Sequence, residues 1–353
     1  MDFHTIWARI GSAIFSAGLA FAGPGSSTAA PAETVVGVSW RYFQDERWKI
    51  DESAMKAVLK TAGLTYVGID AQGDPQKQIA DVEGLIARGA KVLIILAQDA
   101  KAILPVIERA KAEHIPVIAY DAPIDTAGVL YTSFDNVAVG RVMASAQVKA
   151  VPKGNWVQME GDPAQTILQV FKAGQMEVLQ PLIDKGDIKI VARQNVEQWK
   201  PDVAQSLMDQ VLTANNNKVD AVLAMNDSIS NGVAASLAGQ ALLGRVALSG
   251  QDGDAAVLNR IAKGQQTMTV WKDAQALGTV AAKAAVEMAK GTPIDKVGHA
   301  RPLKTASGLM QPSIVLTPVA ITRDNLDLVV SSGWISKAAL CKGVAANAPS
   351  ACR

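Results

Sequence analysis

Three apolar segments in the second half of the chain each end in polar residues that could bind a ligand. The segments AVLAM, VALSG and TMTV are followed by Asn226 and Asp227, by Gln251 and Asp252, and closely by Lys272. Apolar runs of this kind are typical of buried parallel strands, whose carboxyl ends open onto a cleft. Amides, carboxylates and a cationic donor can together hold the neighbouring hydroxyls of a sugar. We therefore expect these side chains to converge on one cleft.

The elements that must position these residues are short apolar runs that alternate with helical patterns. In the first part of the chain the runs cover residues 35–39, 64–69, 91–96, 115–120 and 129–134, with helical periodicity at 51–62, 76–88 and 101–113. A second series extends from 155–160 to 267–272, with helical stretches at 165–185, 201–214, 228–238 and 254–262. Alternating β and α segments with right-handed crossovers form doubly wound sheets. The sequence therefore predicts an α/β fold with two doubly wound parallel-sheet lobes.

The chain is expected to pass between the two lobes more than once. We predict that residues 35–134 and about 274–303 form the N-terminal lobe, and that residues 135–272 and about 304–340 form the C-terminal lobe. The segment KTASGLMQ at 304–311 has the small and polar composition of a linker between lobes. These crossings would form a multi-strand hinge.

Residues 1–30 resemble a secretory signal peptide. Arg9 precedes an apolar stretch from Ile10 to Ala22, and the small residues Ala29 and Ala30 offer a cleavage site. The alternative is a retained membrane anchor, but the apolar run is shorter than the roughly 20 residues that a membrane span needs. We expect an exported protein.

The two cysteines lie close together near the C-terminus. An even number of cysteines in an exported chain favours a disulfide, here between Cys341 and Cys352, which would close the tail 341–353. The alternative is two unpaired thiols. Metal binding is disfavoured because there are two cysteines and no nearby histidine.

Charge and motifs argue against several other classes of protein. The net charge is +1, from 34 basic and 33 acidic residues, so no basic field suggests a nucleic-acid partner. The chain lacks the glycine pattern of dinucleotide-binding enzymes and the serine motif of hydrolases. A sugar-responsive DNA repressor would need an N-terminal helix-turn-helix where the signal-like segment lies. We expect no catalytic residue, metal or cofactor, and an α/β enzyme acting on a sugar is a weaker alternative.

Several segments, in a fixed order, resemble the periplasmic sugar-binding proteins of ABC transporters, of the ribose and xylose type. They include GVSWRYFQDERW, IPVIAYD, SFDNVAVG, TANNNKVDAVLAMND, VALSGQDGD and RIAKGQQTMTVWK. The resemblance covers nearly the whole chain after residue 35 and implies a class I periplasmic binding protein, with two lobes joined by a three-strand hinge. It implies a periplasmic monomer that captures a monosaccharide or polyol by lobe closure and delivers it to an ABC transporter permease. The alternative is a sugar sensor that feeds a chemoreceptor or another signalling protein.

The resemblance also implies a set of ligand-binding residues at strand ends or in the loops that follow: Arg47, Trp48, Asp121, Asp135, Asn136, Trp199, Asn226, Asp227, Gln251, Asp252 and Lys272. Carboxylates, amides and cations would bond to hydroxyls, and tryptophan rings would pack against C–H groups. Structural roles are the alternatives. The two tryptophans could be packing aromatics, the aspartates at 121, 135 and 252 could be helix N-caps, and residues 136 and 227 could be structural.

The sequence departs from the family pattern at three places near the expected cleft. Ala122 follows Asp121 where the family usually has arginine, residues 164–168 replace a polar loop, and Trp40, Arg41 and Tyr42 replace small or acidic residues. Loss of the arginine predicts a roomier cleft and a ligand larger than xylose or differently substituted. Arg41 could supply the missing charge from another direction, and the bulky first loop could refill the space. The choice of sugar stays open.

Overall fold

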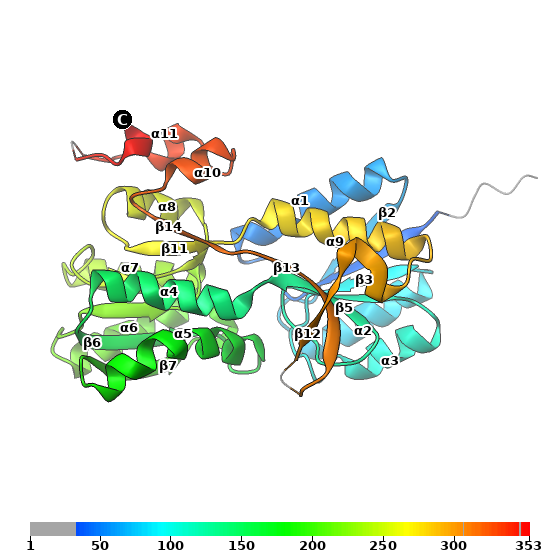
Figure 1. Cartoon of the computed structure of the whole chain (residues 1–353), viewed down its shortest axis with the longest axis horizontal. Coiled ribbons are helices and arrows are strands. Elements are labelled where there is room, and N and C mark those ends of the chain that lie inside the picture. Colours follow the sequence, from blue (N-terminus) through cyan, green and yellow to red (C-terminus); the bar gives the residue numbers. More distant parts are fainter. Residues whose placement is uncertain (1–32, 306, 346) are drawn as a thin grey trace, which may run out of the picture. The chain divides into compact units, whose positions relative to one another are not determined.

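The computed structural model describes residues 33–353, except residues 306 and 346. The predicted signal peptide lies outside this range. Residues 34–353 form one unit, in which strands and helices are arranged around separate sheets (Figure 1). No helix in the described part of the chain is both long and apolar enough to cross a membrane.

The sheet of the first lobe has seven strands and is doubly wound. Its strands, in spatial order, are β2 (Thr65–Asp70), β1 (Val35–Trp40), β3 (Val92–Ile95), β4 (Val117–Tyr120), β5 (Val129–Phe134), β13 (Met310–Leu316) and β12 (Arg301–Lys304). All neighbours are parallel except the edge strand β12. The direction of winding reverses between β1 and β3, which is where such sheets usually form their binding crevice.

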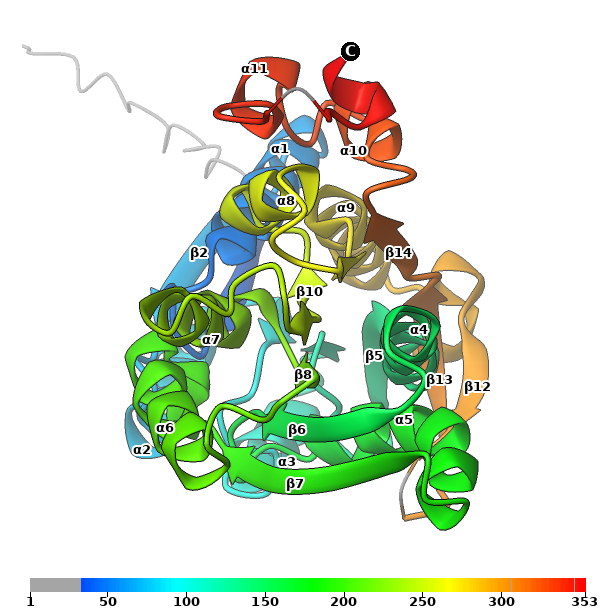
Figure 2. The ribbon, with the colours of Figure 1, turned by 90° about the vertical axis from the view of Figure 1, so that its left-hand side faces the viewer.

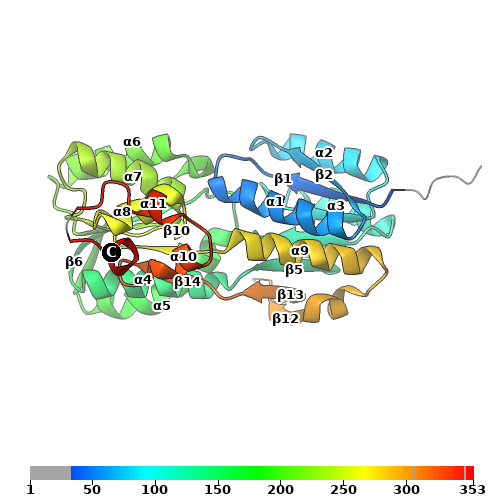
Figure 3. The same ribbon diagram turned by 90° about the horizontal axis from the view of Figure 1, so that it is seen from above.

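Two pairs of helices cover the two faces of this sheet. Helices α1 (Glu46–Thr61) and α9 (Ala274–Ala289) lie side by side on one face (Figure 3), and α2 (Pro75–Ala87) and α3 (Leu104–Ala112) cover the other. In β3, Val92 and Ile94 belong to the apolar cluster under the first pair, whereas Leu93 belongs to the cluster under the second. Burial on both faces explains why this strand is apolar throughout.

The second lobe contains two smaller sheets. The four-stranded parallel sheet is ordered β7 (Ile188–Asn195), β6 (Gly154–Glu160), β8 (Ala221–Ala224) and β9 (Ala247–Leu248). The three-stranded sheet is ordered β10 (Gln251–Asp252), β11 (Met268–Trp271) and β14 (Val319–Thr322). Figure 2 shows the helices around them: α4 (Asn136–Ala150), α5 (Ile167–Asp184), α6 (Pro201–Ala214), α7 (Asp227–Gly239) and α8 (Ala255–Ala262).

The apolar segment VALSG forms only the short strand β9, and the ladder breaks at Gly250 before β10 begins. A Cβ atom on Gly250 would lie 2.0 Å from Oδ1 of Asp227, so the carboxylate occupies the place beside this glycine. Backbone bonding continues past the break, because the amide of Val270 donates to the carbonyl of Gly250. The segment around β11 therefore stays hydrogen-bonded to the chain on both sides of the break, through Leu248 and Gly250.

The chain passes between the two lobes at three places: between β5 and α4, between β11 and α9, and between β13 and β14. The prediction that residues from 304 onward belong to the second lobe is wrong for β13. Strands β12 and β13 form an antiparallel hairpin, in which Lys304 pairs with Met310. β13 then pairs with β5 and removes its open edge, which accounts for its place in the first sheet.

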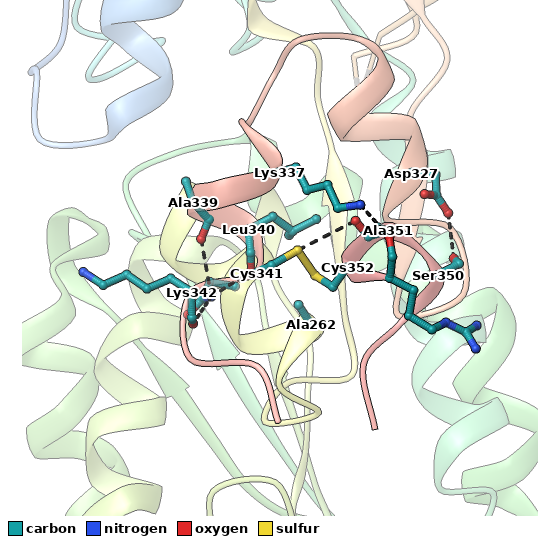
Figure 4. The surroundings of a disulfide bond; sticks show 12 residues. Ala262, Asp327, Lys337, Ala339, Leu340, Cys341, Lys342, Ser350, Ala351 and Cys352 are labelled. Carbon is teal, nitrogen blue, oxygen red and sulfur yellow. Dashed lines mark hydrogen bonds between the residues drawn. A yellow bond between two sulfur atoms is a disulfide. The ribbon is translucent and has the colours of Figure 1, made fainter. Parts of the chain in front are cut away.

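The C-terminal tail contains α10 (Asp327–Ser331), α11 (Lys337–Leu340) and a final turn at Ser350–Cys352. Cys341 and Cys352 form the predicted disulfide (Figure 4). Leu340 and Ala351 flank the bridge and pack into an apolar cluster with Ile261 of α8. The disulfide therefore closes a small loop on the surface of the second lobe.

Helices α4 and α5 approach each other through glycines. A Cβ atom on Gly140 would lie 2.0 Å from the carbonyl oxygen of Phe171, and one on Gly174 would lie 1.9 Å from that of Val137. Neither backbone oxygen can move without disturbing its own helix. The two helices can pack at this distance only because both positions lack a side chain.

We predict that Gly174→Ala lowers the free energy of unfolding by about 1–3 kcal/mol or more, because overpacking forces the helices apart. Gly84→Ala on α2 is the matched control, since no atom lies within 4 Å of its added Cβ. It should stabilise the protein by roughly 0.5–1 kcal/mol through helix propensity. Urea unfolding of both variants measures the difference, and a stabilising Gly174→Ala would contradict the packing described.

Candidate ligand-binding site

Loops at the carboxyl ends of strands from both lobes line one small cavity. Its lining residues are Arg41, Asp45, Arg47, Trp48, Asp121, Trp199, Asn226, Gln251, Asp252 and Lys272. Its volume of about 20 Å³ is enough for a single water molecule, which needs at least about 10–15 Å³, but not for a sugar. Opposing side chains therefore nearly fill the space, and a sugar could enter only if they separate.

Arg47 is the centre of this cluster. Helix α1 begins at Glu46, five residues before the predicted start at 51, so Arg47 projects from its first turn. Its guanidinium lies 3.0 Å from Asp252, 3.3 Å from Asp121 and 3.3 Å from Asp51, and the residue is only 2% exposed. Because Asp252 belongs to the second lobe, this ion pair joins the two lobes.

Lys272 forms a second ion pair between the lobes. It follows β11 directly, and its Nζ lies 2.8 Å from Oδ1 of Asp121 and 5.5 Å from the ring centre of Phe134. Asp121 has φ 56° and Asp252 has φ 114°, although neither is a glycine. Such backbone conformations cost free energy and persist only where surrounding contacts impose them.

Burial and charge shift the pKa values of these groups in different directions. Burial raises the pKa of Asp252 to about 6, against the opposing effects of Arg47 and Lys272. Burial would also raise the pKa of Asp121, but Arg47 and Lys272 outweigh it and hold that pKa well below its usual range. Burial lowers the pKa of Lys272, which Asp121 partly opposes. Asp121 is thus firmly ionised, whereas Asp252 can take up a proton near pH 6.

The first loop contributes two lining residues that were not among the predicted site residues. Nη1 of Arg41 donates to Oε1 of Gln165 at 2.5 Å. Asp45 occupies the N-cap position of α1 but makes no capping bond. Its carboxylate instead accepts from Nε1 of Trp48 at 3.1 Å and from the hydroxyl of Ser228 in the second lobe. The segment WRYFQDERW contained both residues, but nothing local indicates that Asp45 turns away from its helix.

Trp199 and Asn226 combine structural contacts with exposure to the cavity. A Cβ atom on Gly161 would lie 2.2 Å from the ring of Trp199, so the indole packs directly on this glycine, and its Nε1 donates to Gln165 at 3.1 Å. Asn226 caps α7 through a 2.9 Å bond from the amide of Ile229. Trp199 is therefore a packing aromatic, as the alternative proposed, as well as a lining residue. Asn226 caps a helix as well as lining the cavity, a role that was not predicted for it.

Three predicted site residues lie away from the cavity. Asp135 is exposed and caps α4 by accepting from the amide of Ala138 at 2.9 Å. Nδ2 of Asn136 donates to the hydroxyl of Ser133 at 2.9 Å. Asp227 is buried, and its Oδ2 accepts from the amides of Gly253 and Asp254 at 2.9 and 2.8 Å. Asp227 thus shapes the turn that carries Asp252.

Ala122 does not line the cavity either. It is 6% exposed and packs in the main apolar cluster beside Tyr120. The room that the missing arginine was expected to leave is therefore not part of this cavity. Arg41 instead brings a guanidinium into the lining, in line with the expectation that it could supply charge from another direction.

Among the described residues, some buried hydrogen-bonding atoms in and next to the lining have no partner. In the lining they are Nε of Arg41 and Oε1 of Gln251. Next to it they are the hydroxyl of Tyr42, which follows Arg41 in the chain, and Nε2 of Gln165, whose Oε1 accepts from Arg41 and Trp199. Buried polar atoms without partners are uncommon in folded proteins. In the described ranges 33–305, 307–345 and 347–353, no group of three or more acidic, histidine or cysteine residues could hold a metal ion.

Residues 36–293 match the family described as "Periplasmic binding protein domain". The chain is 39% identical over 305 residues to the D-xylose-binding periplasmic protein of Escherichia coli (strain K12), covering 86% of this chain and 91% of that protein. The chain belongs to the periplasmic sugar-binding protein family. The D-xylose-binding periplasmic protein of Haemophilus influenzae is 37% identical over 88% of this chain and 93% of that protein. The family resemblance seen in the sequence is thereby confirmed.

A solved structure agrees with the fold. The carbohydrate transporter solute binding protein of Chloroflexus aurantiacus, in complex with D-glucose, superimposes with a TM-score of 0.79 at 29% identity, over 87% of this chain and 98% of that chain. The two-lobed α/β fold of periplasmic binding proteins is confirmed. Members of the family are solute-binding proteins of ABC transporters and not enzymes.

We predict that the pKa of Asp227 makes stability depend on pH. Burial, reinforced by the nearby Asp252, raises this pKa to about 8. Below about pH 4 this carboxyl is protonated in both the folded and the unfolded protein. As the pH rises toward about 8, the carboxyl ionises in the unfolded protein but stays protonated in the folded one, so the free energy of unfolding falls. The free energy of unfolding of the wild type should therefore fall over this range relative to Asp227→Asn. Urea titrations between pH 4 and 9 test this, and a constant difference between the two proteins would refute it.

Proposed function

We propose that this protein captures a neutral monosaccharide or polyol, a xylose-like aldose or a close relative, between its two lobes. It does so in the periplasm and delivers the ligand to the permease of an ABC transporter. The observation that carries this proposal is the set of unsatisfied buried polar atoms around the cavity. Amide, guanidinium and phenol groups without partners are the groups that neighbouring sugar hydroxyls would satisfy.

The charge of the lining supports a neutral ligand. Three cations, Arg41, Arg47 and Lys272, face three carboxylates, Asp45, Asp121 and Asp252. An acidic or basic sugar would leave one charge of the lining without compensation, which is costly in a buried site. Hydroxyls can both donate to carboxylates and accept from cations, so a polyol suits a balanced set.

Names of relatives support the class of ligand. Two proteins that are 37–39% identical are named for D-xylose, and a more distant relative from Mycolicibacterium smegmatis, 26% identical, is named a xylitol-binding protein. The sequence departs from the family pattern at Arg41, which lines the cavity, and at Gln165, which accepts from Arg41 and Trp199. These two residues are the positions at which we expect the choice among pentoses, hexoses and polyols to be made.

The same contacts support a mechanism in which the two lobes open and close around the ligand. Entry of a sugar requires the ion pairs of Arg47 with Asp252 and of Lys272 with Asp121 to open. The three chain crossings between the lobes provide the hinge for this movement. A sugar receptor that signals to another protein is a second candidate, since a relative from Rhizobium radiobacter, 32% identical, is named a multiple sugar-binding periplasmic receptor.

We expect Asp252→Asn to weaken sugar binding at least tenfold at pH 7.5, because a charged hydrogen-bond partner is lost. Asp135→Asn is the matched control, since it makes the same substitution at an exposed helix cap. Its affinity should equal that of the wild type. Calorimetric titration with D-xylose, xylitol, D-ribose and D-glucose measures both variants, and equal affinities in the two variants would place the binding site elsewhere.

Affinity should also depend on pH through Asp252. Because the pKa of this carboxyl is raised to about 6, it is ionised at pH 7.5 and takes up a proton as the pH falls through 6. Protonation removes a negatively charged acceptor, so the dissociation constant should rise between pH 7 and pH 5. Asp252→Asn should show a flatter profile over that range. Titrations of both proteins at several pH values decide this, and parallel profiles would exclude Asp252 as the titrating group.

A further inference from the structure

The C-terminal tail contacts the turn that carries Asp252. Trp334, which lies between α10 and α11, donates from Nε1 to the carbonyl oxygen of Gly253 at 2.6 Å. Its ring also packs edge-on against Trp271, with 5.8 Å between ring centres. Figure 2 shows α10 and α11 beside α8, at the end of the second lobe that carries the smaller sheet. Trp334 is not part of the cavity lining and was not among the predicted site residues.

The turn itself has a backbone that needs support. Asp252 and Gly253 are consecutive residues in the left-handed region, with φ 114° and 89°. Only glycine adopts such angles without strain, so Asp252 is held there by its surroundings. From one side, Asp227 accepts the amides of Gly253 and Asp254. From the other side, Trp334 binds the carbonyl of Gly253.

The indole of Trp334 also lies next to β11, the strand that Lys272 follows. Trp271 immediately precedes Lys272 and pairs with Asp252 in the ladder between β10 and β11. A Cβ atom on Gly253 would lie 2.9 Å from Cδ1 of Trp271 and 3.4 Å from Nε1 of Trp334, so the two rings close over this glycine. Trp334 thus contacts the neighbours of both Asp252 and Lys272.

The tail that carries Trp334 is fixed to the second lobe on both sides of it. Val329 and Ile335 are buried in the apolar cluster that includes Leu258 of α8. Nδ2 of Asn259 donates to the carbonyls of Leu340 and Lys342 at 2.8 and 2.9 Å, next to the disulfide (Figure 4 shows this region). The indole is therefore presented from an anchored segment.

We propose that Trp334 is a positioning residue for the sugar site and acts through Gly253 on Asp252. By fixing the carbonyl that follows Asp252, it maintains the left-handed conformation from which this carboxylate reaches Arg47. This inference rests on the proposed function. It assigns the C-terminal tail a role in ligand affinity in addition to packing.

The test is the affinity of Trp334→Phe for the best sugar found for the wild type. Phenylalanine keeps an aromatic ring against Trp271 but lacks the N–H donor, so we expect affinity to fall about three- to tenfold. In the Asp252→Asn background the same substitution should change affinity less than twofold, because the effects of substitutions at coupled residues do not add. Lys337→Ala is the control, since its Nζ donates to the terminal carbonyl of Arg353 in the same tail and its loss should leave affinity unchanged.

A second readout needs no ligand. Amide exchange of Gly253 and Asp254 should accelerate several-fold in Trp334→Phe but not in Lys337→Ala, because the turn opens more often. If Trp334→Phe does not fold, Trp334→Tyr replaces it, since it also lacks a donor at that position. Unchanged affinity and unchanged exchange, or an equal loss of affinity with and without Asp252, would overturn the inference. A wild type that binds no sugar would instead refute the proposed function, and amide exchange would still decide the role of Trp334.

Discussion

A buried arginine surrounded by carboxylates is the constraint on which the rest of the site depends. Moving a charge out of water costs several kcal/mol, and only close counter-charges can offset this cost. Arg47 has Asp51 and Asp121 in its own lobe, and Asp252 comes from the other lobe. Its environment is therefore complete only when the two lobes meet. Lys272 repeats the arrangement in the opposite direction, since it extends from the second lobe to Asp121.

The aspartates of these ion pairs have backbone conformations that do not occur in regular strands. Asp121 and Asp252 both have positive φ, and each is the point at which a strand ends and the chain turns toward the cavity. The second turn is held by the carboxylate of Asp227 and the indole of Trp334. Free energy from buried hydrogen bonds and aromatic packing thus offsets local strain in the site.

A sugar that replaces one ion-pair contact by hydrogen bonds would leave each lining group with a partner when the lobes close again. The remaining contacts within each lobe hold these side chains in place, and preorganisation of this kind lowers the cost of binding. It also links affinity to lobe closure, because Arg47 and Asp252 are brought to the same point only by the hinge.

The residues alone determine the alternation of apolar runs and helical periods, since burial on one or two faces of a sheet imposes a pattern that is local in sequence. They also placed Arg47, Asp121, Asp252 and Lys272 at or near element ends, where side chains of different strands can meet. Which aspartate faces the cavity and which caps a helix was decided by the tertiary structure. Asp45 and Asp135 precede helices in the same way, but only Asp45 meets a hydroxyl from the other lobe. The pairing of β13 with β5 could not be predicted from the sequence either. The two strands lie far apart along the chain, and packing selects which strand pairs with an open edge.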